Sequence, residues 1–228
     1  MNSLQHIKPN RKKALFFAKR QLPEFVCDAV NLEGIHYTLP EVQTLLEGVS
    51  IGGHKLSDQT ITLNQADAWR FLFQAIKDNT FTLTQTFVCE LHAIAAKDEA
   101  LEWGQFRSGQ VTIAGSAYLP PKAEQLQLLW DRMIEQIESI PDLYARAIAL
   151  FLQMARHQFF YDVNKRMGRF MMNGILLNAG YPAINLPAKR QLEFNQKMLA
   201  FYQNNEMHDM IEFMLSCLSP TVISAMSE

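Results

Sequence analysis

The sequence has little of what marks secreted, membrane or nucleic-acid-binding proteins. Its 3 cysteines lie far apart in no metal-binding spacing, so we expect neither a disulfide framework nor a zinc site. Its 21 Lys and Arg residues against 23 Asp and Glu give a net charge of −2, which supplies no field to attract nucleic acid. No stretch approaches the ~20 apolar residues of a membrane helix, and the first residues lack the apolar core of a signal peptide. We therefore expect a cytoplasmic protein that binds neither nucleic acid nor membrane.

Helical periodicity runs through most of the chain. Hydrophobic residues make up 48% of the sequence and recur three and four positions apart, as on the buried face of a helix. Thr38 and Glu41 have the spacing of a capping box, so a helix is expected to begin there. His92 lies among the apolar residues of another helical stretch, and we expect it to be a core histidine rather than a ligand. Further helices are expected within residues 14–22, 24–34, 64–79, 84–95, 123–138 and 141–156, after residue 165, and twice more before residue 218.

Residues 106–121 (FRSGQVTIAGSAYLPP) are the stretch with strand character. Val111 and Ile113 alternate with polar residues, Gly109 interrupts the run and two prolines end it. A short hairpin with a free edge can take up an extended peptide as an added strand. The expected fold class is therefore all-α with one short β-hairpin.

Residues 157–169 (HQFFYDVNKRMGR) bring together most of the side chains able to do chemistry. Arg166 and Arg169 lie three apart and so share one face at the start of an apolar helix. The helix dipole disfavours a cation there by ~0.3–1 kcal/mol, so its presence needs a reason. Free N–H groups at a helix start, with two arginines above them, form a site for a multiply charged anion such as phosphate. Asp162 beside them can hold a divalent cation that bridges the phosphates.

This stretch resembles the core motif of the Fic family, His-Pro-Phe-x-Asp/Glu-Gly-Asn-Gly/Lys-Arg-x-x-Arg. Counting back from Arg169 aligns the motif slots with Arg166, Lys165, Asn164, Asp162 and Phe160. The slot of the catalytic histidine then falls on Gln158, and the nearby histidine, His157, comes one residue early. The resemblance covers about residues 25–205, and the stretch 106–121 is similar to the family's flap over the active site.

The resemblance implies an all-α Fic core and an enzyme that transfers AMP from ATP to a Ser, Thr or Tyr hydroxyl of a protein. His157 is then expected to point into the site through a bulge and to remove the proton from that hydroxyl. Asp162 is expected to hold Mg²⁺ on the phosphates, and Phe160 to anchor the loop. The phosphates are expected to be bound by Asn164, Lys165, Arg166, Gly168 and Arg169. The target protein is expected to dock on the flap at Gly109, Val111 and Ile113.

Glu33, at the expected end of a helix, lies at the end where the helix dipole disfavours an acid. Fic proteins with a self-inhibiting N-terminal helix carry Ser/Thr-x-x-x-Glu-Gly/Asn. The run from Ala29 to Gly34 resembles that segment, with Ala29 in place of the hydroxyl residue. The resemblance implies that Glu33 pairs with Arg169 and inhibits the protein. We expect an N-terminal helical arm over residues 1–60, with the inhibitory segment at about 25–48, and a Fic core over residues 61–228.

Three alternatives to AMP transfer stay open. Lys165, where many members of the family have Gly, is shared with the phosphorylating Doc toxins, which keeps transfer of the γ-phosphoryl group open. If Gln158 occupies the base slot, the chain is a nucleotide-binding protein with weak catalysis, because Gln cannot take a proton at neutral pH. The third alternative is a protein that regulates its partners by contact. The apolar residues of 11–22 are a candidate homodimer contact.

Overall fold

The structure, a computed structural model, describes residues 7–227, and within that range it is helical with no β-strand. The expected all-α class is confirmed. The α-helices are α1 (Arg11–Arg20), α2 (Leu22–Leu32), α3 (Leu39–Leu46), α4 (Leu56–Lys77), α5 (Gln85–Ala95), α6 (Leu126–Glu138), α7 (Leu143–His157), α8 (Asn164–Asn178), α9 (Gln191–Asn204), α10 (His208–Leu215) and α11 (Pro220–Ser227). Two short 3₁₀ turns precede α6 and α9 at Ala123–Gln125 and Ala188–Arg190.

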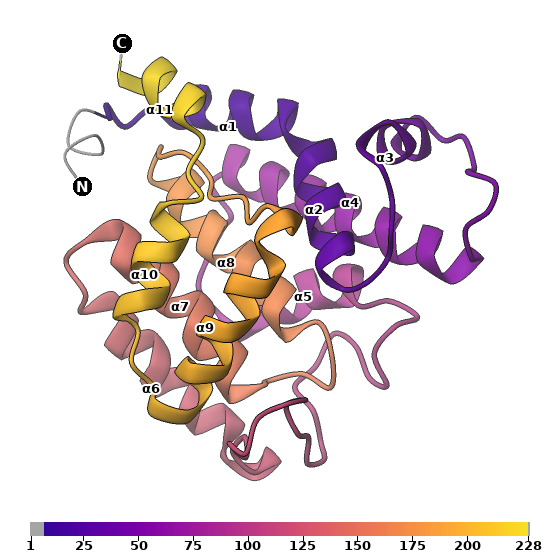
Figure 1. Cartoon of the computed structure of the whole chain (residues 1–228). Coiled ribbons are helices and arrows are strands. Elements are labelled where there is room, and N and C mark those ends of the chain that lie inside the picture. The colour runs from indigo at the N-terminus through magenta and orange to yellow at the C-terminus, as the bar shows by residue number, and fades with distance from the viewer. Residues whose placement is uncertain (1–6, 228) are drawn as a thin grey trace.

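Helices α7 and α8 form the centre of the molecule, and the other helices surround them (Figure 1). Thirteen of the 15 residues of α8 are buried. Gly168 lets the two helices approach closely, because a Cβ built there would lie 2.8 Å from both the carbonyl oxygen and a ring carbon of Phe151. The loop between these two helices contains the sequence motif, so the best-packed part of the fold holds it in place.

Helix α2 is tied to the segment that leads into α9. Asp28 accepts hydrogen bonds from the Asn185 side chain at 2.6 Å and from the Ala188 N–H at 2.8 Å. The Gln191 side chain donates to the Leu32 carbonyl at 2.8 Å, which satisfies a free carbonyl at the end of α2. Gly34 then adopts φ = +82°, a conformation that favours glycine, and the chain turns away. These contacts hold the C-terminal end of α2, with Glu33, over the start of α8.

The expected β-hairpin at residues 106–121 is wrong. This segment is extended, with a turn at residues 114 and 115, but it contains no ladder of backbone hydrogen bonds. Side chains hold its two arms instead: Gln110 donates to the Pro120 carbonyl at 2.9 Å, and Arg107 bonds carbonyls of both arms. Pro120 and Pro121 have no N–H group to donate, so a regular ladder cannot extend to this end.

The helices agree with the expected ranges, with differences at the ends. The capping box of α3 is confirmed, since the Thr38 N–H donates to the Glu41 carboxylate at 2.7 Å and the Thr38 hydroxyl accepts from the Glu41 N–H. Helix α4 begins at Leu56 rather than near residue 64, and α11 was not expected. The division into residues 1–60 and 61–228 stays a prediction.

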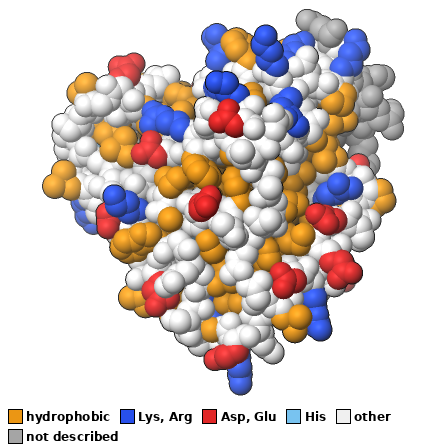
Figure 2. Space-filling view, turned by 180° about the vertical axis from the view of Figure 1, so that it is seen from behind, with side chains coloured by type: hydrophobic (Ala, Val, Ile, Leu, Met, Phe, Trp, Pro, Cys, Tyr) orange, Lys and Arg blue, Asp and Glu red, His pale blue; other side chains and the backbone are white. Residues whose placement is uncertain are grey.

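The two ends of the described chain lie next to each other, because the Lys8 N–H donates to the Met226 carbonyl at 3.2 Å. Charges of both signs are spread over the face shown in Figure 2, with Lys and Arg side chains gathered along its upper edge. Among residues 7–227 no single helix is long and apolar enough to cross a membrane. Helices α10 and α11 pass the length and composition test together, with a bend of 75° between them.

Candidate functional site

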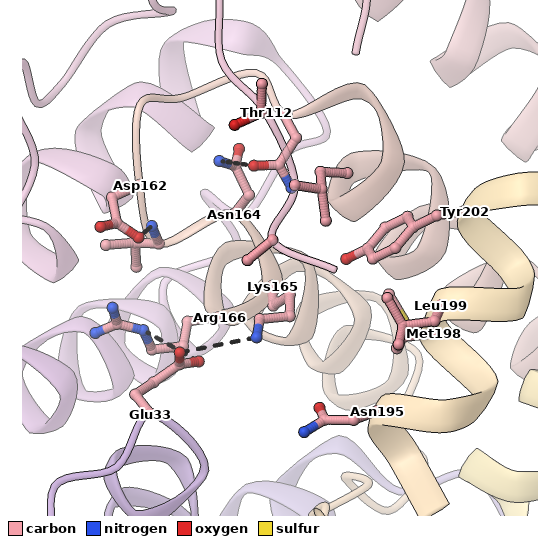
Figure 3. Close-up of a pocket in the computed structure, with 14 residues that line it drawn as sticks. Glu33, Thr112, Asp162, Asn164, Lys165, Arg166, Asn195, Met198, Leu199 and Tyr202 are labelled. Atoms are coloured by element: carbon pink, nitrogen blue, oxygen red, sulfur yellow. Dashed lines mark hydrogen bonds and ion pairs between the residues drawn. The ribbon is translucent and has the colours of Figure 1, made fainter. Parts of the chain in front are cut away.

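A cavity of about 380 Å³ opens beside the start of α8. The C-terminal end of α2, the extended segment 112–114, the α7–α8 loop and one face of α9 surround it (Figure 3). One wall is polar and charged, and the wall from α9 is largely apolar. The lining residues are Glu33, Thr112, Ile113, Ala114, Gln158, Asp162, Val163, Asn164, Lys165, Arg166, Asn195, Met198, Leu199 and Tyr202.

The start of α8 lies at the wall of this cavity, because Asn164, Lys165 and Arg166 are among the lining residues. Val163, just before the helix, has φ = +64°, which is strained for a β-branched residue. Its N–H is held by the Asp162 carboxylate at 2.7 Å. The first N–H groups of a helix have no partner within the helix and lie at its positive end. The strained turn therefore presents an anion-binding helix terminus beside the Lys165 side chain.

The Asn164 side chain makes its hydrogen bonds within the α7–α8 loop. Its amide nitrogen donates to the Phe160 carbonyl at 2.8 Å and to the Gln158 side-chain oxygen at 3.0 Å. Its own oxygen accepts the Phe160 N–H at 2.9 Å. Both hydrogens of the amide are thus occupied, so Asn164 shapes the loop and leaves anion contacts to the backbone and to cationic side chains.

His92 packs against the α7–α8 loop and is the core histidine that the sequence predicts. Its ring stacks on Phe160 with centroids 3.8 Å apart, and both side chains are fully buried. Its Nδ1 accepts the Gly104 N–H at 3.1 Å, which leaves Nε2–H to donate to the Asp162 carbonyl at 3.3 Å. Burial lowers the pKa of His92 to about 4, so the ring is neutral at pH 7. Phe160 is the expected buried anchor of the loop.

Arg107 joins the extended segment to the end of α7. Its buried guanidinium donates to the carbonyls of Gln158 at 2.6 Å, Gly109 at 2.6 Å and Pro121 at 2.5 Å. The Gln158 carbonyl belongs to the negative end of α7, which favours a cation there. Arg107 therefore fixes both arms of the segment 106–121 relative to the motif loop.

The structure places Gln158, not His157, in the cavity. Helix α7 ends at His157, and Gln158 adopts the left-handed conformation with φ = +51°. Its side chain then bridges the Ala155 carbonyl at 2.6 Å and Asn164. Successive helix residues point about 100° apart, so His157 is turned away. The expectation that the His157 ring faces the cavity is wrong.

The His157 ring lies instead against Phe159, with centroids 5.5 Å apart. Its Nδ1 is buried and has no hydrogen-bond partner among the described residues. Burial, reinforced by the nearby Arg156 guanidinium, lowers the pKa of His157 to about 4. His157 is therefore a neutral ring in a packed environment.

Glu33 faces three cations across the cavity wall. Its carboxylate lies 3.8 Å from Lys165 Nζ, 3.8 Å from Arg166 Nε and 3.9 Å from an Arg169 Nη (Figure 3 shows the first two). Burial alone would raise the pKa of Glu33, but Arg166, Lys165 and Arg169 together lower it, so the carboxylate is ionised at pH 7. Glu33 therefore has Arg169 as an ion-pair neighbour and shares its charge with two further cations.

Arg166 has a second and closer acidic partner. Glu99, in the turn after α5, accepts hydrogen bonds from Arg166 Nη1 at 2.9 Å and from Nη2. Arg166 is 3% exposed, so this is a buried charge pair. The sequence gives no local signal for it, because Glu99 lies 67 residues before its partner.

Arg169 and Gly168 do not line the cavity. Arg169 lies behind it, next to a smaller cavity of about 20 Å³ that Ala29 also lines. Burial, opposed by Glu33, lowers the pKa of Arg169 to about 10, which keeps it charged at pH 7. Gly168 faces Phe151, so in this structure it serves the packing of α7 on α8 and makes no contact with the cavity.

The extended segment reaches the cavity through its turn. Ile113 lines the cavity together with Thr112 and Ala114, while Gly109 and Val111 do not, and docking of a target protein on these residues stays a prediction. Gly109 packs against Tyr161 instead, where a Cβ would lie 2.8 Å from the hydroxyl oxygen. The α9 wall has no motif signal in the sequence, because apolar residues at helical spacing indicate a core face and not a cavity. It contributes Asn195, Met198, Leu199 and Tyr202.

Asp162 is the residue at the cavity that suits a magnesium ion. Among residues 7–227 no group of three or more His, Cys, Asp or Glu side chains is arranged to hold a metal by itself. Mg²⁺ on a nucleotide needs only one or two carboxylates, because phosphate oxygens and water complete its coordination. Asp162 is exposed at the cavity rim, and its hydrogen bond to the Val163 N–H fixes its orientation. The residues present therefore fit an ion that arrives with phosphate.

Comparison with known proteins finds similarity to one family. Residues 82–176 match the model of the Fic/DOC family. The chain is 24% identical over 206 residues to the protein adenylyltransferase Fic of Drosophila mojavensis and 25% identical over 207 residues to that of Drosophila melanogaster. Each alignment covers 87% of this chain but only 40% and 41% of the respective relative, so the chain spans about two fifths of their length.

Solved structures share the fold at low sequence identity. A Fic-domain-containing signaling protein from Bacteroides thetaiotaomicron has a TM-score of 0.75 at 21% identity, covering 99% of this chain and 91% of its own. Fic-1 from C. elegans has a TM-score of 0.76 at 17% identity, covering 99% of this chain and 66% of its own. Together with the family model, these likenesses agree with the motif and the helical core described above. Residues 82–176 thus match the Fic/DOC family model, and the chain shares the fold of these Fic structures.

Proposed function

We propose that the cavity binds ATP and that this chain is a nucleotide-binding Fic protein in which transfer of AMP is weak. The observation that carries the proposal is the position of Gln158. Its carboxamide faces the cavity where a base would have to accept a proton, and a carboxamide cannot accept one at neutral pH. A missing general base typically lowers a rate by ~10²–10⁴-fold.

Binding of the phosphates is supported by the charged wall of the cavity. The start of α8 offers free N–H groups, and Lys165 and Arg166 add positive charge beside them. Asp162 would hold Mg²⁺, which would neutralise phosphate charge. A volume of about 380 Å³ lies within the range of small-molecule sites. The apolar face of α9 is suited to the less polar part of a nucleotide.

Glu33 is proposed to inhibit this binding. Its carboxylate occupies the position next to Lys165, Arg166 and Arg169 that a phosphate would need. All three distances are 3.8–3.9 Å, which is too long for direct hydrogen bonds. A phosphate that bonds these groups directly can therefore displace the carboxylate, and its removal should favour ATP.

AMP transfer to a protein hydroxyl is the second candidate. The relatives named protein adenylyltransferase support it, and so does the turn at 112–114, which lies beside the cavity where a target could dock. In that reaction the hydroxyl oxygen bonds the α-phosphorus, the bond to the β-phosphate oxygen breaks, pyrophosphate leaves and the hydroxyl proton goes to a base. Lys165 keeps transfer of the γ-phosphoryl group, as in Doc-type proteins, as a variant of this candidate.

Titration calorimetry and labelled ATP together test the proposal. Glu33→Gln should bind ATP with Mg²⁺, and neither it nor the wild type should transfer label to protein beyond a trace. Absence of ATP binding in folded Glu33→Gln would disprove the nucleotide site. Efficient transfer of α-label to a protein would establish AMP transfer instead, and transfer of γ-label would establish a kinase.

A further inference from the structure

The guanidinium of Arg166 contacts two carboxylates, one by direct hydrogen bonds and the other at a longer distance. Glu99 takes Nη1 and Nη2 in a two-pronged contact, the strongest arrangement for an arginine and a carboxylate. Glu33 lies 3.8 Å from Nε, and Nε has no hydrogen-bond partner among the described residues. Glu99 therefore occupies the end of the guanidinium, while the buried Nε edge is approached by Glu33, a residue that lines the cavity.

Glu99 is itself held firmly. The Glu99 N–H and the Ala100 N–H both donate to the Ala96 carbonyl at 3.1 Å, and Ala96 and Ala100 are buried. The preceding residues are tied to α4 by the Gln65 side chain, which donates to the Ala95 carbonyl at 3.1 Å. The Glu99 side chain is 15% exposed. A carboxylate on such a turn orients the planar guanidinium that it contacts.

We infer that Glu99 is a positioning residue that turns the Nε edge of Arg166 toward the phosphate of a bound nucleotide, while Glu33 competes for that same edge. This inference rests on the proposed nucleotide site. An incoming phosphate should replace Glu33, because that contact has no direct hydrogen bond, and should leave the two direct bonds of Glu99 in place. The two acids near one arginine thus have opposite effects on binding.

The charges agree with this division. Lys165, Arg166 and Arg169 face Glu33, and Glu99 neutralises only Arg166. When Glu33 is displaced, Glu99 still neutralises the buried charge of Arg166. The positive charges of Lys165 and Arg169 are then available to the phosphates. Without Glu99, Arg166 would lose its orientation and would be a buried cation whose end has no partner.

The test removes Glu99 in the background where Glu33 no longer competes. ATP and adenosine binding are measured for Glu33→Gln and for Glu33→Gln/Glu99→Gln, by calorimetry and by NMR titration. We expect the second variant to bind ATP at least tenfold more weakly, the effect of one charge-assisted hydrogen bond, and to bind adenosine as before. A merely structural defect would weaken both ligands alike and would overturn the inference.

Two further variants in the Glu33→Gln background serve as controls. Glu102→Gln removes a nearby acid that bonds Ser108 and not Arg166, so ATP affinity should stay that of Glu33→Gln. Glu99→Asp keeps the charge but shortens its reach by one methylene, so ATP affinity should fall less than in Glu99→Gln. If Glu99→Gln does not fold, Glu99→Asp decides: an unchanged ATP affinity in the folded protein contradicts the inference.

The outcomes separate the inference from the proposed function. If Glu33→Gln binds ATP and adding Glu99→Gln raises that affinity, Glu99 is a second competitor; if the affinity is unchanged, Glu99 neither positions Arg166 nor competes. In both cases only the positioning inference fails. If folded Glu33→Gln binds no ATP, the proposed function fails and the inference falls with it.

Discussion

Asn164 donates a hydrogen bond to the side-chain oxygen of Gln158 at 3.0 Å and so joins the start of α8 to the end of α7. Gln158 in turn donates to the Ala155 carbonyl, which fixes the orientation of its amide. The position that faces the cavity is thus occupied by a fixed hydrogen-bond acceptor that cannot hold a proton. Under the proposed function, this side chain limits AMP transfer more than the cations around it do.

Replacing Gln158 by histidine should create the missing base. A neutral imidazole nitrogen can still accept from Asn164 or, when turned to the cavity, take a hydroxyl proton. Transfer of α-label from ATP should rise by ~10²-fold or more in Gln158→His/Glu33→Gln relative to Glu33→Gln. The matched control is His157→Gln/Glu33→Gln, which changes the neighbouring residue outside the cavity and should transfer no more label than Glu33→Gln. A gain with the control, or none with Gln158→His despite ATP binding, would contradict the assignment.

His92 and His157, whose pKa values are lowered in the fold, should make the protein less stable in mild acid. The pKa of each is about 4 in the folded chain and near 6.5 unfolded, so the unfolded chain binds more protons between these values. Their contribution is complete above about pH 6.5 and is lost as pH falls toward 4. Each should account for on the order of 1–2 kcal/mol of unfolding free energy between pH 7 and 5.

His157→Gln isolates one of these contributions. Urea unfolding of the variant at pH 7 and 5 should show a smaller loss of stability on acidification than the wild type. His208→Gln is the matched control, since it makes the same replacement on an exposed side chain. An equal loss in His157→Gln and the wild type would show that His157 does not titrate in this way.

Arg107 should stabilise the extended segment more than its surface neighbours do. Arg107→Met removes three hydrogen bonds to carbonyls and leaves buried acceptors unsatisfied, which we expect to reduce the unfolding free energy by on the order of 2–4 kcal/mol. Amide hydrogen exchange should accelerate in residues 107–121. Arg132→Met, on the exposed face of α6, removes the same charge and should change neither measurement. A loss below about 0.5 kcal/mol would rule out the bridging role.

Gly168→Ala should force α7 and α8 apart. The added Cβ would lie 2.8 Å from backbone and ring atoms of Phe151, and both helices are in the core. Overpacking of this kind typically costs ~1–3 kcal/mol, or a thermal midpoint lower by ~2–10 °C in a domain of this size. Gly52→Ala is the control, because a Cβ there meets nothing within 4 Å. Equal midpoints for the two variants would contradict the close packing.

Local features of the sequence predicted most of the fold. Helical spacing of apolar residues located the main helices, and the Thr38–Glu41 pair located the start of α3, because both depend on residues a few positions apart. Alternating residues at 106–121 predicted strands that did not form. Strand pairing needs backbone donors on both arms, and here Arg107 and Gln110 side chains take over that part.

Motif and capping signals are short-range, so the residues alone predict a cluster of cations at the start of a buried helix and an acid at the end of another. Tertiary structure places Gln158 rather than His157 at the cavity, since a left-handed turn at the end of α7 selects between the adjacent residues. It alone brought Glu99 to Arg166 across 67 positions of sequence. Such pairings follow from how helices pack, and packing of distant segments leaves no periodic trace in the chain.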